Sequence, residues 1–277
     1  MNLYEIFEQW FLLFLVYSVL GWVWESVFCS LWTTGHFVNR GFLNGPYCPI
    51  YGYGALLDLI LLGRVDDPLL LLFISGSLCC LLEYFTSVAM EKLFHARWWD
   101  YSHMRFHING RICLLGFLAF GAFSVVLIRF VNPLIVQTLT GISKTWIHFL
   151  TAVTFIVFMA DNAITFHDAA DLDQKYREIQ ERLVLFKRRM AAFRNTKENT
   201  ESFFRQMLSL LSGQQQRLLH AFPSLHSLTY PHVLKALQAA MHKSRVEQRT
   251  NSSEVRHSLK QEVKPLGNNK LKERIYE

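Results

Sequence analysis

Five stretches of the chain are apolar and long enough, or nearly so, to cross a lipid bilayer. A helix needs roughly 20 mainly apolar residues to cross about 30 Å of hydrocarbon, and helices suit that medium because they satisfy their own backbone hydrogen bonds. The stretches are Trp10–Trp32, Tyr47–Gly63, Leu69–Met90, Ile112–Val131 and Trp146–Phe166. We therefore predict an all-α fold, a polytopic helical membrane bundle of about five transmembrane helices with the lipid bilayer as its surroundings.

The second of these stretches is the weakest candidate for a full span. Its approach and first half contain Pro46, Pro49, Gly52 and Gly54, and residues of these types break helices and free backbone groups. Irregular backbone at membrane depth is stable only where protein or a watery cavity surrounds it. We therefore expect a re-entrant or unwound start. The loop 39–54 is then either a site or gate, or a tight turn between the first two spans.

Charge divides the chain into regions. Residues 1–166 carry 8 Lys+Arg and 10 Asp+Glu, whereas residues 167–277 carry 20 and 12. This contrast predicts a transmembrane bundle over 1–166, a helical and partly coiled-coil region over 167–243, and a basic, disordered tail over 244–277. The tail lacks the aromatic-rich signatures of nucleic-acid modules, so we expect no nucleic-acid partner and assign its charge to attraction by anionic lipid.

The positions of Lys and Arg in the loops predict the orientation. With the N-terminus outside, the inside loops carry five of these residues and the outside loops three, and cytoplasmic loops are the ones enriched in them. The basic tail also falls inside in this arrangement. We therefore expect a multi-pass protein of the bacterial cell membrane with the N-terminus outside and the C-terminal tail in the cytoplasm.

An apolar stripe with the heptad spacing of a coiled coil follows the fifth span. Steps of four and three residues alternate along it without a break, as at the a and d positions of a coiled coil. Its members are Leu172, Tyr176, Ile179, Leu183, Phe186, Met190 and Phe193. The stripe predicts either a homodimer through residues 172–193, or a helix that packs on its own chain or lies on the membrane surface.

Acidic residues inside the predicted spans are candidates for function, because inserting a charge costs roughly 2.5–3.5 kcal/mol. Glu25 and Glu83 each lie about seven residues from the inner end of their span, which is roughly 10 Å below the cytoplasmic boundary. Asp161 lies nearer that boundary, and Asp58 lies beyond the middle of the membrane. This placement predicts a polar cavity open to the cytoplasm. The alternative is that the acids are capped by hydrogen-bond donors and only join helices.

Further candidates lie in the loops. Asp100 is expected to pair with Arg105 or Arg111, and Arg40 or Arg111 would supply the counter-charge of the cavity. Two histidines four residues apart in the same loop are too few for a zinc site. The complete set of substrate or cavity candidates is Glu25, Arg40, Asn44, Pro46, Pro49, Tyr51, Asp58, Glu83, Asp100, Asn109, Arg111 and Asp161.

Several motifs are absent from the sequence. It contains no Gly-x-x-x-x-Gly-Lys-Ser/Thr, no Gly-x-Ser-x-Gly and no His-Glu-x-x-His, which are the motifs of P-loop ATPases, serine hydrolases and zinc proteases. Five scattered cysteines match neither a disulfide scaffold nor a zinc ribbon. We therefore expect no cofactor and no metal, and we assign no catalytic residue. Whether the chain is an enzyme stays open at this point.

A set of short motifs in the first 114 residues resembles a known family. They are Gly21-Trp-x-x-Glu25, Arg40-Gly-Phe-Leu-x-Gly45-Pro-x-x-Pro49-Ile-Tyr-Gly52, Glu83, Trp99-Asp-Tyr-Ser102 and Asn109-Gly-Arg-Ile-Cys-Leu114. Taken together they resemble the bacterial ABC-transporter type IV permease family (CmpB-like), over about residues 5–165. The resemblance implies a multi-pass membrane protein connected with transport, and it assigns no substrate and no role to individual residues.

Three functions fit these observations. The first is a membrane permease subunit of an ABC-type transporter, which would rely on a separate ATPase. The second is an intramembrane enzyme acting on a lipid or another amphiphile, with Glu25 and Glu83 as general base and acid. The third is a membrane scaffold or regulator that acts through the coiled coil.

Overall fold

The computed structural model describes residues 2–190, 203 and 206–241, without the side chains of residues 33–34 and 187–190. Its helices and strands, in chain order, are α1 (Leu3–Val23), the π-helix η1 (Trp24–Cys29), α2 (Ser30–Thr34), α3 (Pro49–Leu62), α4 (Pro68–Phe94), β1 (Ala96–Arg97), β2 (His107–Ile108), β3 (Ile112–Cys113), α5 (Leu114–Val126), the π-helix η2 (Leu127–Val131), α6 (Asn132–Thr140), α7 (Lys144–Met190), α9 (Gly213–Ala221) and β4 (His226–Ser227). Residues 231–241 are also helical. The predicted all-α fold is confirmed, because the strands are only two residues long.

Local sequence explains where several helices begin and end. Asn2 caps α1 in a capping box with Glu5, which satisfies backbone N–H groups that a helix start leaves unpaired. The Asp67 carboxylate accepts from the backbone N–H groups of Leu69 and Leu70 at 2.8 and 3.1 Å, and thereby caps α4. Gly35 ends α2 at a φ of 69°, a left-handed conformation that glycine adopts without steric cost.

Four helices are long and apolar enough to cross a membrane: Leu3–Trp32, Pro68–Phe94, Leu114–Thr140 and the helix that begins at Lys144. The second predicted span is shorter than expected, because α3 has only 14 residues. At about 1.5 Å per residue it is roughly 21 Å long, less than the hydrocarbon thickness of about 30 Å. Residues 36–48 before it are not helical, which agrees with the unwound start expected from its prolines and glycines.

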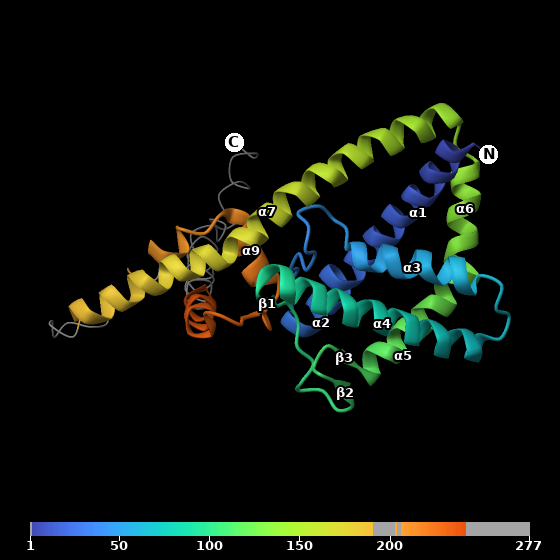
Figure 1. Cartoon of the computed structure of the whole chain (residues 1–277). Helices are drawn as coiled ribbons and strands as arrows, with labels where there is room; N and C mark the ends of the chain where they lie inside the picture. The colour runs from blue at the N-terminus through green and yellow to red at the C-terminus, as the bar shows by residue number, and fades with distance from the viewer. Residues whose placement is uncertain (1, 191–202, 204–205, 242–277) are drawn as a thin grey trace, which may run out of the picture.

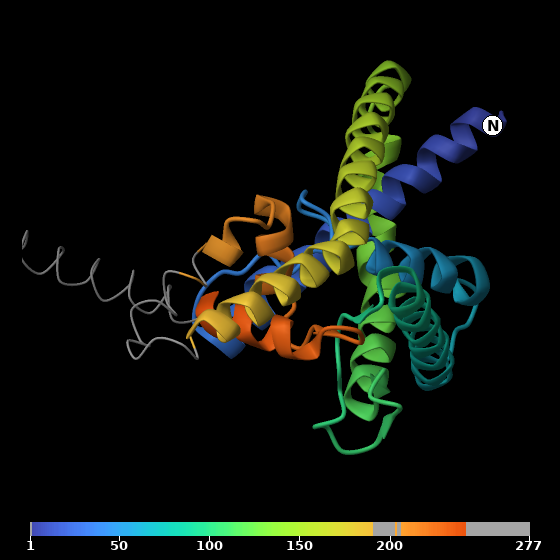
Figure 2. The same cartoon turned by 60° about the vertical axis from the view of Figure 1, so that its left-hand side comes forward.

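α7 is one unbroken helix of 47 residues. Figures 1 and 2 show it running from beside the start of α1 to well beyond the other long helices. α9 packs against its middle, where the Gln215 side chain donates to the Asp168 carbonyl at 3.0 Å. The fifth predicted span and the apolar stripe therefore belong to the same helix, and the change in composition near residue 167 does not interrupt it.

α4 and α5 pack closely because glycines face backbone at their contact. A Cβ added to Gly76 would lie 2.8 Å from the Phe117 carbonyl oxygen, and one added to Gly121 would lie 2.4 Å from that of Leu72. Larger residues at these positions would push the helices apart. The C-terminal end of α4 leads into β1, which pairs antiparallel with β4 of the C-terminal region.

A separate apolar core surrounds the second half of α7. Leu172, Tyr176 and Ile179 are each no more than 3% exposed, and they share a cluster with Trp98 and with residues of the C-terminal region. The other members from that region include Met207, Leu211, Leu218, Leu234 and Leu237. The first half of the apolar stripe is therefore covered by its own chain.

Candidate functional site

Glu25 lies in a wide turn of the first spanning helix. The π-helix η1 interrupts the α-helical pattern at residues 24–29, and such insertions change the direction in which side chains point and recur at functional sites. The Tyr51 hydroxyl, on the first turn of α3, donates to the Glu25 carboxylate at 2.5 Å. Two of the predicted site residues, from two different helices, therefore meet.

Glu83 on α4 faces the same region. It is 6% exposed, and the Tyr101 hydroxyl donates to its Oε1 at 3.0 Å. Burial raises the pKa of the Tyr101 phenol, and the nearby carboxylates of Glu83 and Glu25 raise it further. Tyr101 is therefore hydrogen-bonded to Glu83 and interacts electrostatically with Glu25. We call Glu25, Tyr51, Glu83 and Tyr101 the acid–phenol site.

One oxygen of this site has no hydrogen-bond partner. The Glu83 Oε2 atom is buried and accepts from no donor among the residues that the structure describes. Over the same part of the chain, neither Glu25 nor Glu83 has a Lys, Arg or His nitrogen within 4.0 Å. A buried acceptor without a donor destabilises the protein, so a hydrogen-bond donor bound at this oxygen would stabilise the site.

Asp161 on α7 has the opposite surroundings. Its Oδ1 accepts from the backbone and side-chain nitrogens of Asn44 at 3.0 and 2.9 Å and from the Thr165 hydroxyl at 3.1 Å. Its Oδ2 accepts from the Gly45 backbone N–H at 2.7 Å and the Tyr47 hydroxyl at 2.6 Å. Five donors thus hold this carboxylate. It fixes loop 39–48 to α7, and Pro46 lies between two of the donor residues.

Arg217 on α9 holds the same loop from the C-terminal region. Its two terminal nitrogens donate to the backbone carbonyls of Gly41 and Phe42, each at 2.7 Å, and its Nε donates to Gln214 at 2.8 Å. Burial lowers the pKa of this guanidinium, and nearby Asp161 partly offsets that effect. Loop 39–48 is therefore bonded on one side to a spanning helix and on the other to the C-terminal region.

Asp58 on α3 is fully buried between α4 and α5. Its Oδ2 accepts from the Ser124 hydroxyl at 2.5 Å and from the Cys79 thiol at 3.6 Å. Its Oδ1 has no donor among the described residues. Asp58 thus joins three helices through one oxygen, and neither of its partners belongs to the acid–phenol site.

Arg111 and Asp100 have partners other than those expected. Arg111 donates to Glu91 at 2.9 Å and to Ser87 at 2.8 Å, so Glu91 is its counter-ion. The expected pairing of Asp100 with Arg105 or Arg111 is wrong, since Asp100 lies 3.8 Å from Arg97. The chain reverses at Asn109 and Gly110, both with positive φ, and this turn carries Arg111 toward α4.

The remaining loop candidates have local roles in the structure. The Asn109 side chain donates to the Tyr84 hydroxyl at 3.0 Å, and the Arg40 backbone N–H donates to Ser26 at 3.0 Å. His107 accepts from the Gly110 backbone N–H at 3.1 Å. No group of three or more His, Cys, Asp or Glu that could hold a metal occurs among the described residues.

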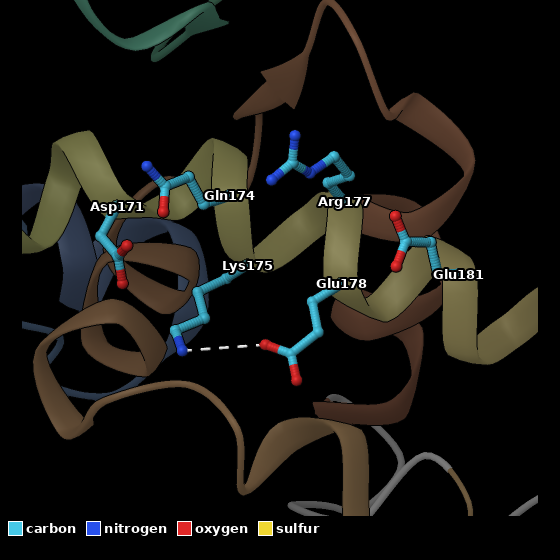
Figure 3. A pocket seen from close by; sticks show the side chains of 6 residues that line it. All are labelled: Asp171, Gln174, Lys175, Arg177, Glu178 and Glu181. Atoms are coloured by element: carbon cyan, nitrogen blue, oxygen red, sulfur yellow. Dashed lines mark ion pairs between the residues drawn. The ribbon is translucent and has the colours of Figure 1, made fainter.

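A polar hollow of about 280 Å³ lies on the second half of α7, beyond the stretch 146–166 that was predicted as the fifth span. Figure 3 shows the six side chains that line it, all from α7, with the ion pair between Lys175 and Glu178 at 3.8 Å. The six are Asp171, Gln174, Lys175, Arg177, Glu178 and Glu181. None of the acids of the spans contributes to it.

The C-terminal part of the apolar stripe is less covered. Leu183 and Phe186 are half-buried, and Phe186 stacks on Phe203 with ring centroids 4.2 Å apart. Phe193 and the side chain of Met190 lie outside the described part of the chain.

Sequence reasoning missed Tyr101, Glu91, Ser124, Cys79 and Arg217. Tyr101 belongs to the motif Trp99-Asp-Tyr-Ser102, but the distance along the chain between Tyr101 and Glu83 follows no pattern that would predict their contact. Arg217 was one of many basic residues in the C-terminal region. Its contact with Gly41 spans 176 positions, and no local pattern indicates such a contact.

These features define a class of protein: a helical membrane protein with carboxylates buried in its spans and a C-terminal region bonded to a loop between them. Residues 12–166, more than half of the chain, match the family described as "Putative ABC-transporter type IV", and the chain belongs to this family. No curated protein and no solved structure matches it.

Proposed function

We propose that this chain is the membrane permease subunit of an ABC-type transporter that relies on a separate ATPase subunit, with the acid–phenol site on the route of the cargo. The family match supports the connection with ABC transport. The absence of a P-loop motif from the sequence agrees with an ATPase on another chain.

The bonding of loop 39–48 is the observation that carries the proposal. A permease subunit must convey movement from the ATPase to its cargo site, and this requires a continuous mechanical connection. Arg217 connects the C-terminal region to the loop, and the loop leads directly into Pro49 and Tyr51. Tyr51 in turn contacts Glu25. A displacement of α9 would thus reach the acid–phenol site along the continuous stretch of chain from Phe42 to Tyr51.

The orientation that we propose has the N-terminus outside the cell and the C-terminal region in the cytoplasm. Glu5 and Lys144 form an ion pair at 2.7 Å, and His148 lies 2.7 Å from Glu8, so α1 and α7 begin on the same side. The C-terminal region packs around the far half of the 47-residue α7. It is therefore at the opposite end, where a cytoplasmic ATPase could reach it.

Co-purification tests the proposal. The full-length chain would be purified under mild conditions from cells that carry its neighbouring genes, and the associated proteins identified by mass spectrometry. We expect a polypeptide with a P-loop motif whose ATP hydrolysis changes in the presence of this chain. Arg217→Gln should reduce that change, whereas Arg182→Gln, which alters an exposed Arg of α7, should not. A preparation with no associated ATP hydrolysis would contradict the proposal.

A homodimer through residues 172–193 is a further part of the proposal, and two copies would double the number of spans. Leu172, Tyr176 and Ile179 are already covered by their own chain, so among the described residues a partner would contact α7 farther along, where Val184 and Leu185 are exposed. Val184→Asp with Leu185→Asp should abolish crosslinked dimers of the full-length protein while insertion persists. Monomeric wild-type protein by light scattering would rule out the dimer.

A further inference from the structure

The acid–phenol site has the chemistry to bind a positively charged group. Its polar atoms are two carboxylates and two phenol oxygens, contributed by the first spanning helix, α3, α4 and the loop after β1. No cationic side chain of the described residues lies within 4.0 Å of either carboxylate. Such a site attracts cations and repels anions.

The unpaired Glu83 Oε2 defines the kind of cation more closely. This atom lies on a side chain that is 94% buried and requires a hydrogen-bond donor. A primary ammonium carries three N–H donors, so it could give one to Oε2 and others to Glu25 or the phenol oxygens. A quaternary ammonium has no N–H and would leave Oε2 unpaired.

A metal ion fits the site less well. Structural and catalytic metal sites in proteins usually present three or more His, Cys, Asp or Glu ligands, and no such group occurs among the described residues. Both phenols already use their O–H to donate to the carboxylates. An ammonium requires only acceptors with lone pairs to spare, and the carboxylates and phenol oxygens have them.

We infer that the acid–phenol site binds the primary ammonium group of a cationic, amphiphilic cargo, with Glu83 as its hydrogen-bonding counter-ion and Glu25 as the second carboxylate. The inference rests on the proposed function, because it names the charge of the cargo on that route. The amphiphilic character follows from the surroundings, since Glu25 and Glu83 lie on helices that are long and apolar enough to cross a membrane.

Binding by the purified full-length chain tests the inference without an ATPase, so its outcome is separate from that of co-purification. The probe is octylamine, which is protonated at about pH 7 as a lysine side chain is. A ligand that binds the folded state raises the unfolding temperature in a concentration-dependent way. Octyltrimethylammonium has the same alkyl chain and octanoate has a chain one carbon shorter, so both control for insertion of the chain into the micelle.

We expect octylammonium to raise the unfolding temperature and octanoate to have no such effect. Glu83→Gln keeps the shape of the side chain but removes its charge, and should weaken the apparent affinity by about tenfold or more. Glu25→Gln should have the same effect. The matched control Glu178→Gln removes an acid from the polar hollow on α7, and should leave the affinity unchanged.

Four results would overturn the inference. These are an equal shift with octanoate, an affinity for octyltrimethylammonium as high as for octylammonium, an unaltered affinity in Glu83→Gln, or a loss of affinity in Glu178→Gln instead. If Glu83→Gln does not fold, the comparison of the three probes on the wild-type chain still decides the outcome, because only a donor-bearing cation should bind.

Discussion

Asp161 and Glu83 are two carboxylates of the spanning helices with almost the same exposure, 8% and 6%, and with very different surroundings. Asp161 accepts hydrogen bonds from four residues through both of its oxygens. Glu83 accepts one, from Tyr101, and its other oxygen has no donor in the part of the chain that the structure describes. Equal burial therefore does not mean an equal role.

The difference separates an acid that stabilises the fold from one available to a ligand. A buried carboxylate becomes favourable only when donors replace the water it has lost. Donors from loop 39–48 replace the water that the Asp161 carboxylate has lost, so a substitution of Asp161 disturbs the loop. The Glu83 carboxylate has a described donor at Oε1 alone, so a donor from a bound ligand would satisfy its Oε2 atom.

Asp161→Asn is expected to have the largest effect on stability. The amide nitrogen would face groups that themselves donate, among them the Gly45 backbone N–H, and would leave buried donors unpaired. The expected loss is about 3 kcal/mol of unfolding free energy. Unfolding of the purified protein in detergent measures it. Asp66→Asn, in an exposed loop, is the control and should change stability little; a similar loss in both would contradict the role given to Asp161.

Arg217→Gln tests the other attachment of the same loop. It removes two charge-assisted hydrogen bonds to backbone carbonyls and should cost about 2 kcal/mol locally. Cys48 is the last residue of the loop and is buried, so its labelling by a maleimide should accelerate by about tenfold or more. Mass spectrometry of the labelled peptides measures the rate. The labelling rate of Arg217→Lys should lie between those of the wild type and Arg217→Gln. An unchanged rate would mean that the loop is held by Asp161 alone.

Asp58→Asn should have an intermediate effect on stability. The Oδ2 atom of Asp58 has donors in Ser124 and Cys79, while its Oδ1 has none. An asparagine can keep the accepting oxygen and place its amide where no donor is lost, so we expect a change of about 1 kcal/mol. The same unfolding measurement applies. A loss as large as that of Asp161→Asn would show that donor count does not predict the effect.

Glu83→Gln should have the smallest effect on stability. A neutral amide costs less to bury than a carboxylate, and Tyr101 can still donate to the remaining oxygen. We expect the free energy of unfolding to stay within about 1 kcal/mol of the wild type or to rise, while the affinity for octylammonium falls by about tenfold or more. Destabilisation comparable to that of Asp161→Asn would show that Glu83 also stabilises the fold. The proposed difference in role between Asp161 and Glu83 would then be wrong.

Part of the candidate site could be predicted from residue type alone. Glu25, Asp58, Glu83 and Asp161 stood out because a carboxylate is rare in an apolar stretch, and the structure buries the last three almost completely. Their depth in the spans did not distinguish Asp161 from Glu83. That distinction depends on the Asn44 and Gly45 donors, which lie more than 110 positions away along the chain.

The apolar stripe shows the same limit. Its spacing predicts that one face of this helix packs against an apolar partner, and the first half of the stripe lies in an apolar core. The same spacing is produced whether the partner is a second copy or another part of the chain. In the structure, residues such as Met207 and Leu218 cover Leu172 and Ile179, and neither carries a pattern that identifies its contact.

The sequence by itself determined the helical class of the fold, the apolar spans and the ends of several helices, such as those capped by Asn2, Asp67 and Gly35. These features arise from interactions within a few residues, so local composition and spacing encode them. Only the tertiary structure decided which buried acid is fully bonded, which has an unpaired oxygen, and which residue attaches the C-terminal region to the bundle. Those properties depend on donors brought together from distant segments, and a hydrogen bond across 176 positions leaves no periodic trace in the sequence.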